Sequence, residues 1–431
     1  MKQSSIVLGL ALWFGGCNVD RADADTGGID LGGAGAAGRS GTEPQERPSV
    51  RGFAVFNSDY ESTSVSLIDS DGEVLSEVFI ASSSTSTGLS APLSGDVVPP
   101  TMAAAGDELA LIERTPASVL TWVDLETAEV RAQLSVATGF SANPHDYVSV
   151  SETKAYVTRF EPNLDAGHEP HDAGDDVLVV DPSRAAITGR IDLGPALDGE
   201  PDQFFARPDR ALLAGGQLRV AVAGLNADFS DALDSRIVTV DPDSDEITQV
   251  LVLEGMHGCV HLALSPDAAT LAVGCSGLFG GDPEAGHPDS GIVLVHVADE
   301  LSEKQRFGSG ELGGSQINGT AYASGTSLLY TTFGRWNDDR SALAAPDTLR
   351  RLDLSTGQAD PDPLLESRDE PFVIADTRCS VADRVCFATD TETNGGVVHR
   401  FDLDAAGRPG DPTAIEVERA IGLPPRHLGV F

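Results

Sequence analysis

The sequence predicts an all-β protein and, within that class, a closed seven-bladed β-propeller. Three observations support this prediction: a short apolar strand ending in an acidic residue recurs along the chain, its spacing is nearly constant, and one unpaired strand stands at each end of the repeat region. A near-fixed period of this length, with four strands in each period, is typical of propellers.

The recurring strand marks seven units. It reads VSLID, LTWVD, VLVVD, IVTVD, IVLVH, LRRLD and VHRFD, with last residues Asp69, Asp124, Asp181, Asp241, His296, Asp353 and Asp402. Successive last residues are therefore 55, 57, 60, 55, 57 and 49 positions apart. The third unit shows the four strands clearly, as DYVSVS, KAYVTRF, DVLVVD and AITGRIDLG. Such nearly continuous apolar strands are expected where neighbouring sheets cover both faces.

The two ends of the repeat region complete each other. The segment GFAVFNSD, at residues 52–59, resembles the second strand of a unit, and the closing PPRHLGVF resembles a first strand with no second strand after it. We expect residues 428–431 to pair beside residues 52–56. This pairing would close the ring and remove its open edges.

The repeat resembles the YVTN repeat family of seven-bladed propellers. The resemblance is carried by LSPDAATLAV, SVSETKAYVTR and DDVLVVDPSRAAITGRIDLG, although only the third unit has YVT, with Arg159 where the family has Asn, and only the fifth has SPD. It implies the propeller fold. It implies no particular activity, because propellers of this family serve as surface proteins, binding scaffolds and, in relatives, enzymes.

The N-terminal sequence predicts export and lipid anchoring. Residues 1–17 have the layout of a lipoprotein-type signal peptide, with FGGC resembling a lipobox in which Cys17 is lipidated. Residues 18–50 are rich in Gly and Ala and predict a disordered, flexible tether, followed by the propeller at 51–431. Asn18 after the cysteine favours the outer membrane of a bacterial envelope, on its periplasmic or outer surface. A secreted protein without the lipid is the alternative.

The charge excludes some partners. The chain has 28 Lys and Arg against 67 Asp and Glu, which becomes 27 against 67, a net charge of −40, once Lys2 leaves with the signal. Such a surface repels nucleic acid and anionic lipid. We therefore expect no nucleic-acid partner, no membrane contact beyond the lipid anchor, and a monomer.

Four cysteines remain after Cys17, and they fall into two hairpins. Cys259 and Cys275 are equidistant from Asp267, and Cys379 and Cys386 flank the turn at Asp383. In an exported chain this arrangement predicts two cross-strand disulfides. The alternative is a Cys2His2 zinc site, since His257, Cys259 and His261 alternate along a strand opposite Cys275.

Long loops and histidines gather on one predicted rim of the ring. His145, His257 and His427 stand at or just before first strands and predict a ligand or metal site at the channel mouth. The long loops supply candidate binding residues, namely Asp165, Asp172, His287, Arg335 and Trp336. Their carboxylates are dense enough for calcium, but no twelve-residue calcium loop is present. Ordinary polar loop residues, with Trp336 packing its own loop, are the alternative interpretation.

Two functions follow as hypotheses. The first is a non-enzymatic, lipid-anchored scaffold that binds a protein, a glycan or a small ligand through its loop-rich rim. The second is a metal- or channel-centred hydrolase, lyase or lactonase that uses the three histidines. No catalytic motif such as GxSxG or HExxH is present in the sequence. No cofactor is indicated beyond calcium or zinc as alternatives.

Overall fold

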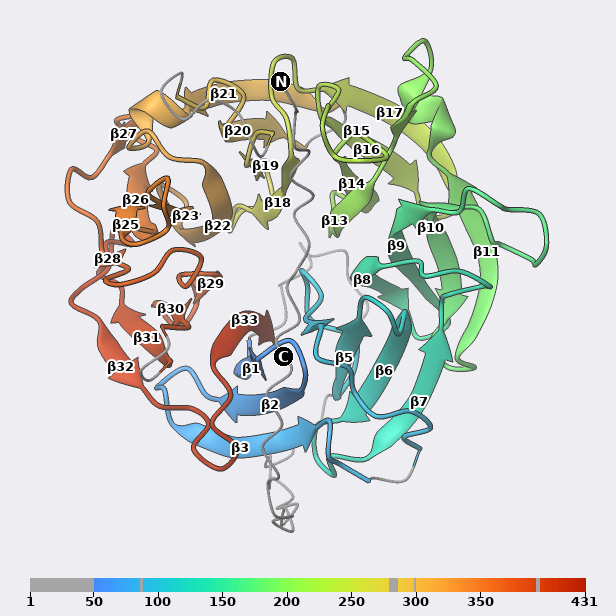
Figure 1. Ribbon diagram of the computed structural model, residues 1–431, viewed down its shortest axis with the longest axis horizontal. Coiled ribbons are helices and arrows are strands. Elements are labelled where there is room, and N and C mark those ends of the chain that lie inside the picture. The colour runs from blue at the N-terminus through green and yellow to red at the C-terminus, as the bar shows by residue number, and fades with distance from the viewer. Residues whose placement is uncertain (1–49, 86–87, 279–285, 298–299, 393–395) are drawn as a thin grey trace, which may run out of the picture.

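The computed structural model describes residues 50–85, 88–278, 286–297, 300–392 and 396–431. These residues form seven antiparallel sheets, or blades, arranged as a ring (Figure 1). The seven-bladed propeller predicted from the repeat is confirmed. Cys17 and nearly all of the predicted tether lie outside the described residues. No helix in the described ranges is long and apolar enough to cross a membrane.

Each of the first four blades runs from an inner strand to an outer strand. Blade 1 comprises β33 (Pro425–Val430), β1 (Phe53–Ser58), β2 (Thr63–Ile68) and β3 (Val74–Ala81). Blade 2 comprises β4 (Val97–Val98), β5 (Glu108–Glu113), β6 (Val119–Asp124) and β7 (Val130–Ser135). Blade 3 comprises β8 (Pro144–Ser151), β9 (Lys154–Pro162), β10 (Gly174–Asp181) and β11 (Ala186–Asp192). Blade 4 comprises β13 (Pro208–Ala214), β14 (Gln217–Val222), β16 (Arg236–Asp241) and β17 (Glu246–Val252).

The remaining three blades follow the same order. Blade 5 comprises β18 (Cys259–Leu264), β19 (Thr270–Cys275), β20 (Gly291–His296) and β21 (Ser302–Gly308). Blade 6 comprises β22 (Ile317–Ser324), β23 (Ser327–Thr332), β26 (Thr348–Asp353) and β27 (Gln358–Ala359), with β28 (Leu365–Glu366) also on β26. Blade 7 comprises β29 (Thr377–Ser380), β30 (Val385–Asp390), β31 (Val397–Asp402) and β32 (Thr413–Ile415).

Short ribbons and turns lie in the connections between these strands. Two small ribbons pair β12 (Phe204–Phe205) with β15 (Leu225–Asn226) and β24 (Arg335–Trp336) with β25 (Leu343–Ala345). The 3-10 turns η1 (Gly194–Leu197) and η3 (Ser309–Glu311) follow outer strands. The residues that marked the repeat in the sequence end the third strand of each blade or, for Asp69, follow it directly.

The ring closes by pairing of its two ends. Strand β1 pairs with the C-terminal β33 in the register Phe53 with Val430 and Val55 with Leu428. Figure 1 shows the two strands side by side near the centre of the ring. The pairing expected between residues 428–431 and 52–56 is therefore confirmed, and blade 1 contains strands from both ends of the chain.

The hydrophobic core consists of seven clusters, each between two neighbouring blades of the described chain. Strand β1 shows how one strand serves two of them. Ala54 and Phe56 pack against blade 2, whereas Phe53 and Val55 pack against blade 7. Successive side chains of a strand point to opposite faces, so a strand between two neighbours must be apolar on both. This explains the continuous apolar runs in the sequence.

The two predicted disulfides are present. Cys259 is bonded to Cys275 and Cys379 to Cys386, and each pair is directly opposed in a hairpin. The zinc alternative is therefore wrong, because oxidised cysteines cannot supply thiolate ligands. The opening strands of blades 5 and 7 are tied covalently to their second strands.

The connections divide between two faces of the ring. We call the loop face the one formed by the links from the second to the third strand of a blade and from its fourth strand to the next blade. The turn face carries the links from first to second and from third to fourth strands. The channel mouth is the set of loop-face ends of the seven inner strands. Most of the long connections lie on the loop face, as the sequence predicted.

Candidate functional site

Exposed aromatic side chains are concentrated on the loop face. Tyr60, Phe229 and Phe372 are 55%, 45% and 50% exposed, and all three lie in loop-face connections. Leu164 and Ile421, which are also exposed, lie on the same face. Tyr60, Phe229 and Phe372 belong to blade 1, to blade 4 and to the link between blades 6 and 7, so they are distributed around this face. Burial of such side chains is normally favourable, which makes the loop face the candidate interaction surface.

These three aromatic residues also share an uncommon backbone conformation. Their φ angles are 69°, 60° and 68°, in the left-handed region that bulky residues rarely occupy. Sparsely populated conformations cost free energy and tend to persist where function requires them. Each ring also contacts a neighbouring side chain, Tyr60 that of Arg426, Phe229 that of Arg207 and Phe372 that of Phe333, while about half of its surface stays exposed.

His145 lies at the channel mouth, near the start of the inner strand of blade 3. Its Nδ1 lies 2.9 Å from an Oδ2 of Asp209, which belongs to blade 4, and its ring stacks on Phe160 at 4.4 Å between centroids. Burial acts to raise the pKa of Asp209, but His145 and then Arg210 outweigh it and lower this pKa to about 2. The carboxylate is therefore ionised and holds the imidazole in one orientation.

A row of stacked groups runs outward from His145. Phe160 lies parallel to Phe229 at 6.3 Å, and the guanidinium carbon of Arg207 lies 5.1 Å from the first ring and 4.5 Å from the second. Arg207 itself is buried and also forms an ion pair with Glu161. Cation–π contacts are strengthened by such desolvation. The exposed Phe229 is thus fixed to a rigid base that reaches the channel mouth.

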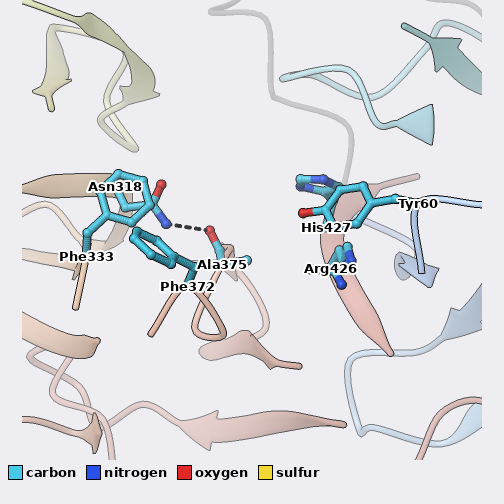
Figure 2. Close-up of a pocket in the computed structure, with 7 residues that line it drawn as sticks. All are labelled: Tyr60, Asn318, Phe333, Phe372, Ala375, Arg426 and His427. Carbon is cyan, nitrogen blue, oxygen red and sulfur yellow. Dashed lines mark hydrogen bonds between the residues drawn. The ribbon is translucent and has the colours of Figure 1, made fainter. Parts of the chain in front are cut away.

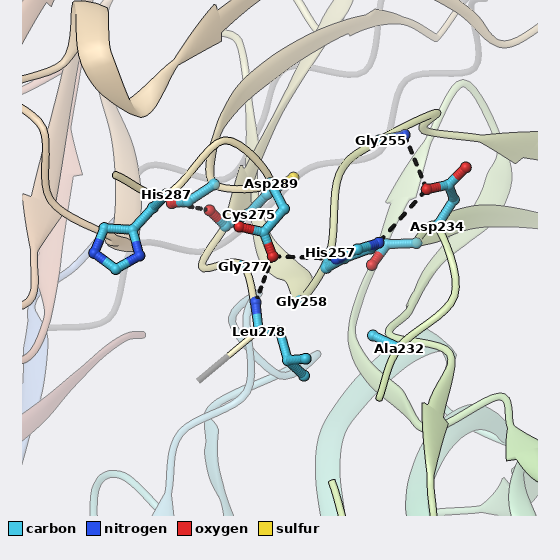
Figure 3. A network of polar contacts seen from close by, with 12 residues as sticks. Ala232, Asp234, Gly255, His257, Gly258, Cys275, Gly277, Leu278, His287 and Asp289 are labelled. Carbon is cyan, nitrogen blue, oxygen red and sulfur yellow. Dashed lines mark hydrogen bonds and ion pairs between the residues drawn. The ribbon is translucent and has the colours of Figure 1, made fainter. Parts of the chain in front are cut away.

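His257 joins the loops of blades 4 and 5, as Figure 3 shows. Its Nδ1 lies 3.1 Å from Asp289 and its Nε2 lies 3.6 Å from Asp234. The hydrogen bond with Asp289 raises the pKa of His257, and the nearby charges of Asp289 and Asp234 act in the same direction against burial. Both ring nitrogens face carboxylates of the protein. His257 therefore links two loops through its two ring nitrogens, a contact that we call the clasp, and neither nitrogen is directed at an open ligand site.

Asp289 in turn depends on its neighbours for its position. It accepts a hydrogen bond from the backbone N–H of Leu278, at 2.8 Å. A Cβ at Gly277, where φ is +74°, would lie only 2.8 Å from its carboxylate oxygen. A glycine is required here both by the backbone conformation and by the close approach. The nearby His287 side chain points away from His257 (Figure 3).

His427 lines a cavity of about 170 Å³ at the channel mouth, between blades 6, 7 and 1. Figure 2 shows Phe333, Phe372, Asn318 and Ala375 on one side and Tyr60, Arg426 and His427 on the other. Burial lowers the pKa of His427 to about 3, so the imidazole is neutral near pH 7. It can donate one hydrogen bond and accept one.

The structure does not gather His145, His257 and His427 into one site. His145 contacts Asp209 on the inner strand of blade 4, His257 contacts Asp234 and Asp289 in the loops of blades 4 and 5, and His427 lines a cavity to which neither of the other two histidines contributes. Within the ranges that the structure describes, no group of three or more His, Cys, Asp or Glu side chains is placed to hold a metal ion.

The acidic loop of blade 3 satisfies its own carboxylates. Asp172 accepts hydrogen bonds from the backbone N–H groups of Gly167, His168 and Glu169, which lower its pKa to about 2. Asp165 is exposed and lies 3.4 Å from His168. The carboxylate of Asp172 is thus used to shape the loop, and it is less available as a calcium ligand.

The remaining predicted binding residues lie on the loop face. Trp336 is half-buried and Arg335 exposed, and both stand on the ribbon formed by β24 and β25. His287 is half-buried in the loop of blade 5. Phe279, Asp282 and Glu284, which precede His287 in the chain, lie outside the described residues.

Sequence reasoning missed Tyr60, Phe229, Phe372 and Arg426. The available signal was an aromatic residue inside a polar loop, as in SDYES and NADFSD. That signal does not distinguish a ring that packs on its own loop from one that is exposed. The missing information was the backbone geometry.

Comparisons with known proteins identify the fold. No family model and no curated protein matches the sequence. Among solved structures, a candidate 6-phosphogluconolactonase from Bacteroides fragilis matches with a TM-score of 0.53 at 13% identity, over 90% of this chain and 100% of that one. A Lactobacillus plantarum protein matches with a TM-score of 0.51 at 10% identity, over 89% and 99%. Hydrazine synthase of Kuenenia stuttgartiensis matches with a TM-score of 0.51 at 14% identity, over 71% and 77%. At these identities the likeness supports the fold and leaves the activity open.

Proposed function

We propose that this protein is a binding module of the bacterial envelope that engages its partner through the loop face. The observation that carries the proposal is the set of three exposed aromatic residues, Tyr60, Phe229 and Phe372, on one face of a closed ring. Aromatic and arginine side chains supply much of the free energy at interfaces, and a rigid scaffold reduces the entropy lost on binding. A protein or a glycan is the expected partner class.

Anchoring through a lipidated Cys17 is part of the proposal, and the fold gives it a consequence. The backbone N–H of Arg51, at the start of the propeller, donates to the carbonyl of Phe431 on the turn face. A tether that enters there would favour the turn face toward the membrane and the loop face away from it. A flexible linker of this length spans about 30 Å on average, so the orientation would be biased rather than fixed.

The test is a set of matched surface variants. Asn tolerates positive φ, so the triple variant Tyr60→Asn, Phe229→Asn, Phe372→Asn removes the rings without adding backbone strain. The control Val74→Asn removes an exposed apolar residue from the turn-face end of β3. Binding to envelope proteins and to a glycan array should be lost in the triple variant and kept in the control. A partner bound equally well by the wild type and the triple variant would contradict the proposal.

A hydrolase or lyase is the second candidate, and one observation favours it. His145 and Asp209 form an Asp–His pair at the channel mouth, an arrangement that can orient a general base. The test is hydrolysis of a panel of lactones and esters by the wild type and by His145→Gln. Turnover that disappears in this variant, with an unchanged melting temperature, would favour the enzyme over the binding module.

A further inference from the structure

The cavity at the channel mouth has two chemically different sides (Figure 2). One side is apolar and contains the rings of Phe333 and Phe372, whose centroids are 5.6 Å apart at an angle of 58°. The two rings come from different connections of the loop face, and Phe372 is half-exposed. A flat apolar group placed here would contact aromatic surface.

The other side of the cavity is cationic. The Nε of Arg426 donates to the backbone carbonyl of Ser58 at 2.6 Å, and its guanidinium carbon lies 4.1 Å from the centre of the Tyr60 ring. These two contacts fix the plane of the guanidinium at the edge of the cavity. The charge of Arg426 therefore lies over the Tyr60 ring, in a side chain that lines the cavity.

The lack of an acidic partner for Arg426 is unusual in a chain with so many acidic residues. Acidic residues outnumber basic ones by 67 to 28, yet Arg426 forms no ion pair with any carboxylate of the described residues. Nearby Arg114 and Arg378, by contrast, lie within ion-pair distance of Asp96 and Asp376. An unpaired guanidinium beside a cavity is a ready site for an anion.

The polar groups of the cavity carry no opposing charge. The Nδ2 of Asn318 donates to the carbonyl of Ala375 at 3.2 Å, and the side chain is neutral. None of the seven residues that line the cavity is acidic. Within the lining a bound cation would therefore meet Arg426 and no carboxylate, whereas an anion would meet a cation and uncharged hydrogen-bonding groups. Asp376 and Asp96, whose charges act on His427, lie outside the lining.

The size of the cavity limits the ligand further. Its volume is about 170 Å³, and apolar protein cavities of about 150 Å³ bind benzene. One six-membered ring with a small substituent therefore fits inside the cavity, and a larger ligand would have to extend beyond it. A bare inorganic anion would leave the aromatic side unused.

We propose that this cavity binds a small single-ring carboxylate, with the ring against Phe333 and Phe372 and the carboxylate at Arg426. This inference rests on the proposed function, because it assigns a ligand class to part of the same loop face. The carboxylate supplies a charge-assisted hydrogen bond, and the ring supplies buried apolar area. Both parts of the ligand are needed for binding.

The first experiment varies the probe and leaves the wild-type protein unchanged. Binding of benzoate, benzamide and acetate is measured by saturation-transfer NMR and titration calorimetry. Benzamide keeps the ring and shape but lacks the charge, and acetate keeps the charge but lacks the ring. Benzoate should bind saturably, and each of the other two at least tenfold more weakly. Equal binding of benzoate and benzamide, or no saturable binding of benzoate, would overturn the proposal.

The second experiment varies the protein. Arg426→Gln should weaken benzoate binding at least tenfold and leave benzamide nearly unchanged, whereas Phe372→Asn should weaken both. The control Arg408→Gln removes an arginine from the turn-face link between β31 and β32 and should change neither. Benzoate binding that is unaffected in folded Arg426→Gln would overturn the proposal. If this variant is unfolded, Arg426→Lys, which keeps the charge but loses the planar fork, should bind benzoate with intermediate affinity.

The outcomes separate this inference from the proposed function. If benzoate fails to bind while the triple aromatic variant still loses its partner, the cavity assignment is wrong and the binding module stands. If benzoate binds with the expected dependence on Arg426 and no partner depends on the three aromatic residues, the cavity assignment stands and the broader proposal is wrong.

Discussion

The turn face and the loop face of the ring use acidic residues in different ways. On the turn face, the aspartates that mark the repeat cap their own turns: Asp124 accepts from the backbone N–H groups of Glu126 and Thr127, and Asp241 accepts from that of Asp243. On the loop face, carboxylates such as Asp209 and Asp289 hold side chains of other segments. The periodic residues therefore build the scaffold, and the aperiodic ones shape the candidate site.

The comparison suggests that the scaffold and the loop face can be disrupted separately. The largest effect should come from removing what both faces share, which is ring closure. Deleting Arg426–Phe431 removes most of β33, with the buried Leu428 and Phe431, and leaves β1 paired only with β2. We expect a loss on the order of 5 kcal/mol or more in the free energy of unfolding and a melting temperature lower by about 10 °C or more. Thermal unfolding followed by circular dichroism measures it, and an unchanged melting temperature would refute ring closure.

The second effect concerns a buried ion pair beneath the loop face. Arg159 and Asp176 are both fully buried and joined by two hydrogen bonds, of 2.8 and 2.7 Å. Asp176→Ala would leave the Arg159 charge uncompensated, so we expect a loss of about 3–5 kcal/mol. The control Asp107→Ala breaks the exposed pair with Arg51 and should cost under about 1 kcal/mol. Denaturant unfolding compares them, and equal costs would contradict the argument.

The fold was predictable from the sequence because similar residues recur at the turn after the third strand of each blade. An acidic residue at the end of the third strand recurs in every blade but the fifth, where His296 replaces it, and the spacing of these residues gave both the period and the number of blades. Apolar residues on both faces of the strands followed from the same packing between blades. The disulfides were predictable because hairpin partners are equidistant from their turn.

The candidate site was predictable only in part. The sequence placed His145, His257 and His427 at the starts of inner strands on the correct face. It did not show that Asp209 contacts the ring of His145 and that Asp289 contacts the ring of His257, because each pair is far apart in the chain. Contacts between blades depend on the distance and rotation between sheets, which no local pattern records. The exposure of the Tyr60, Phe229 and Phe372 rings depends on the φ angles of these three residues, which a sequence pattern does not record.

The third effect tests the turn face alone. Asp124→Ala removes the hydrogen bonds that this carboxylate accepts from Glu126 and Thr127. We expect a loss of about 1 kcal/mol, the net value typical of such hydrogen bonds. Binding by the loop face should not change. Unfolding by denaturant and a binding assay on the same sample check both parts, and weakened binding would show that the faces are coupled.

The fourth effect tests a loop-face clasp through pH. The pKa of His257 is raised above 6.5, chiefly by its hydrogen bond with Asp289. Its contribution to stability should be complete below about pH 6 and lost as the pH rises through the raised pKa. NMR titration of the imidazole should give a midpoint above 6.5. Asp289→Asn should lower this midpoint more than Asp234→Asn, because the contacts are 3.1 and 3.6 Å. A wild-type midpoint at or below 6.5 would exclude the clasp.

The smallest effect on stability is expected at the ribbon of blade 6. Arg335 is exposed, and Trp336 is half-buried opposite Leu343 in a short hairpin that stands outside the blade sheets. Arg335→Ala should change the free energy of unfolding by under about 0.5 kcal/mol, and Trp336→Ala by about 1 kcal/mol or less. Both should weaken binding of a loop-face partner, since arginine and tryptophan are frequent anchors at interfaces.

The matched control for this ribbon must lie on the turn face and carry no contact between blades. Asp245 is unsuitable, because it accepts from the Tyr156 hydroxyl at 2.5 Å and lies 2.8 Å from Lys154, both in blade 3. Asp243→Ala is the better choice and should change neither stability nor binding. If Trp336→Ala lowers the melting temperature markedly, the indole packs its own loop. If binding falls in Asp243→Ala and not in Arg335→Ala, the partner engages the turn face, because a loop-face partner would be indifferent to Asp243.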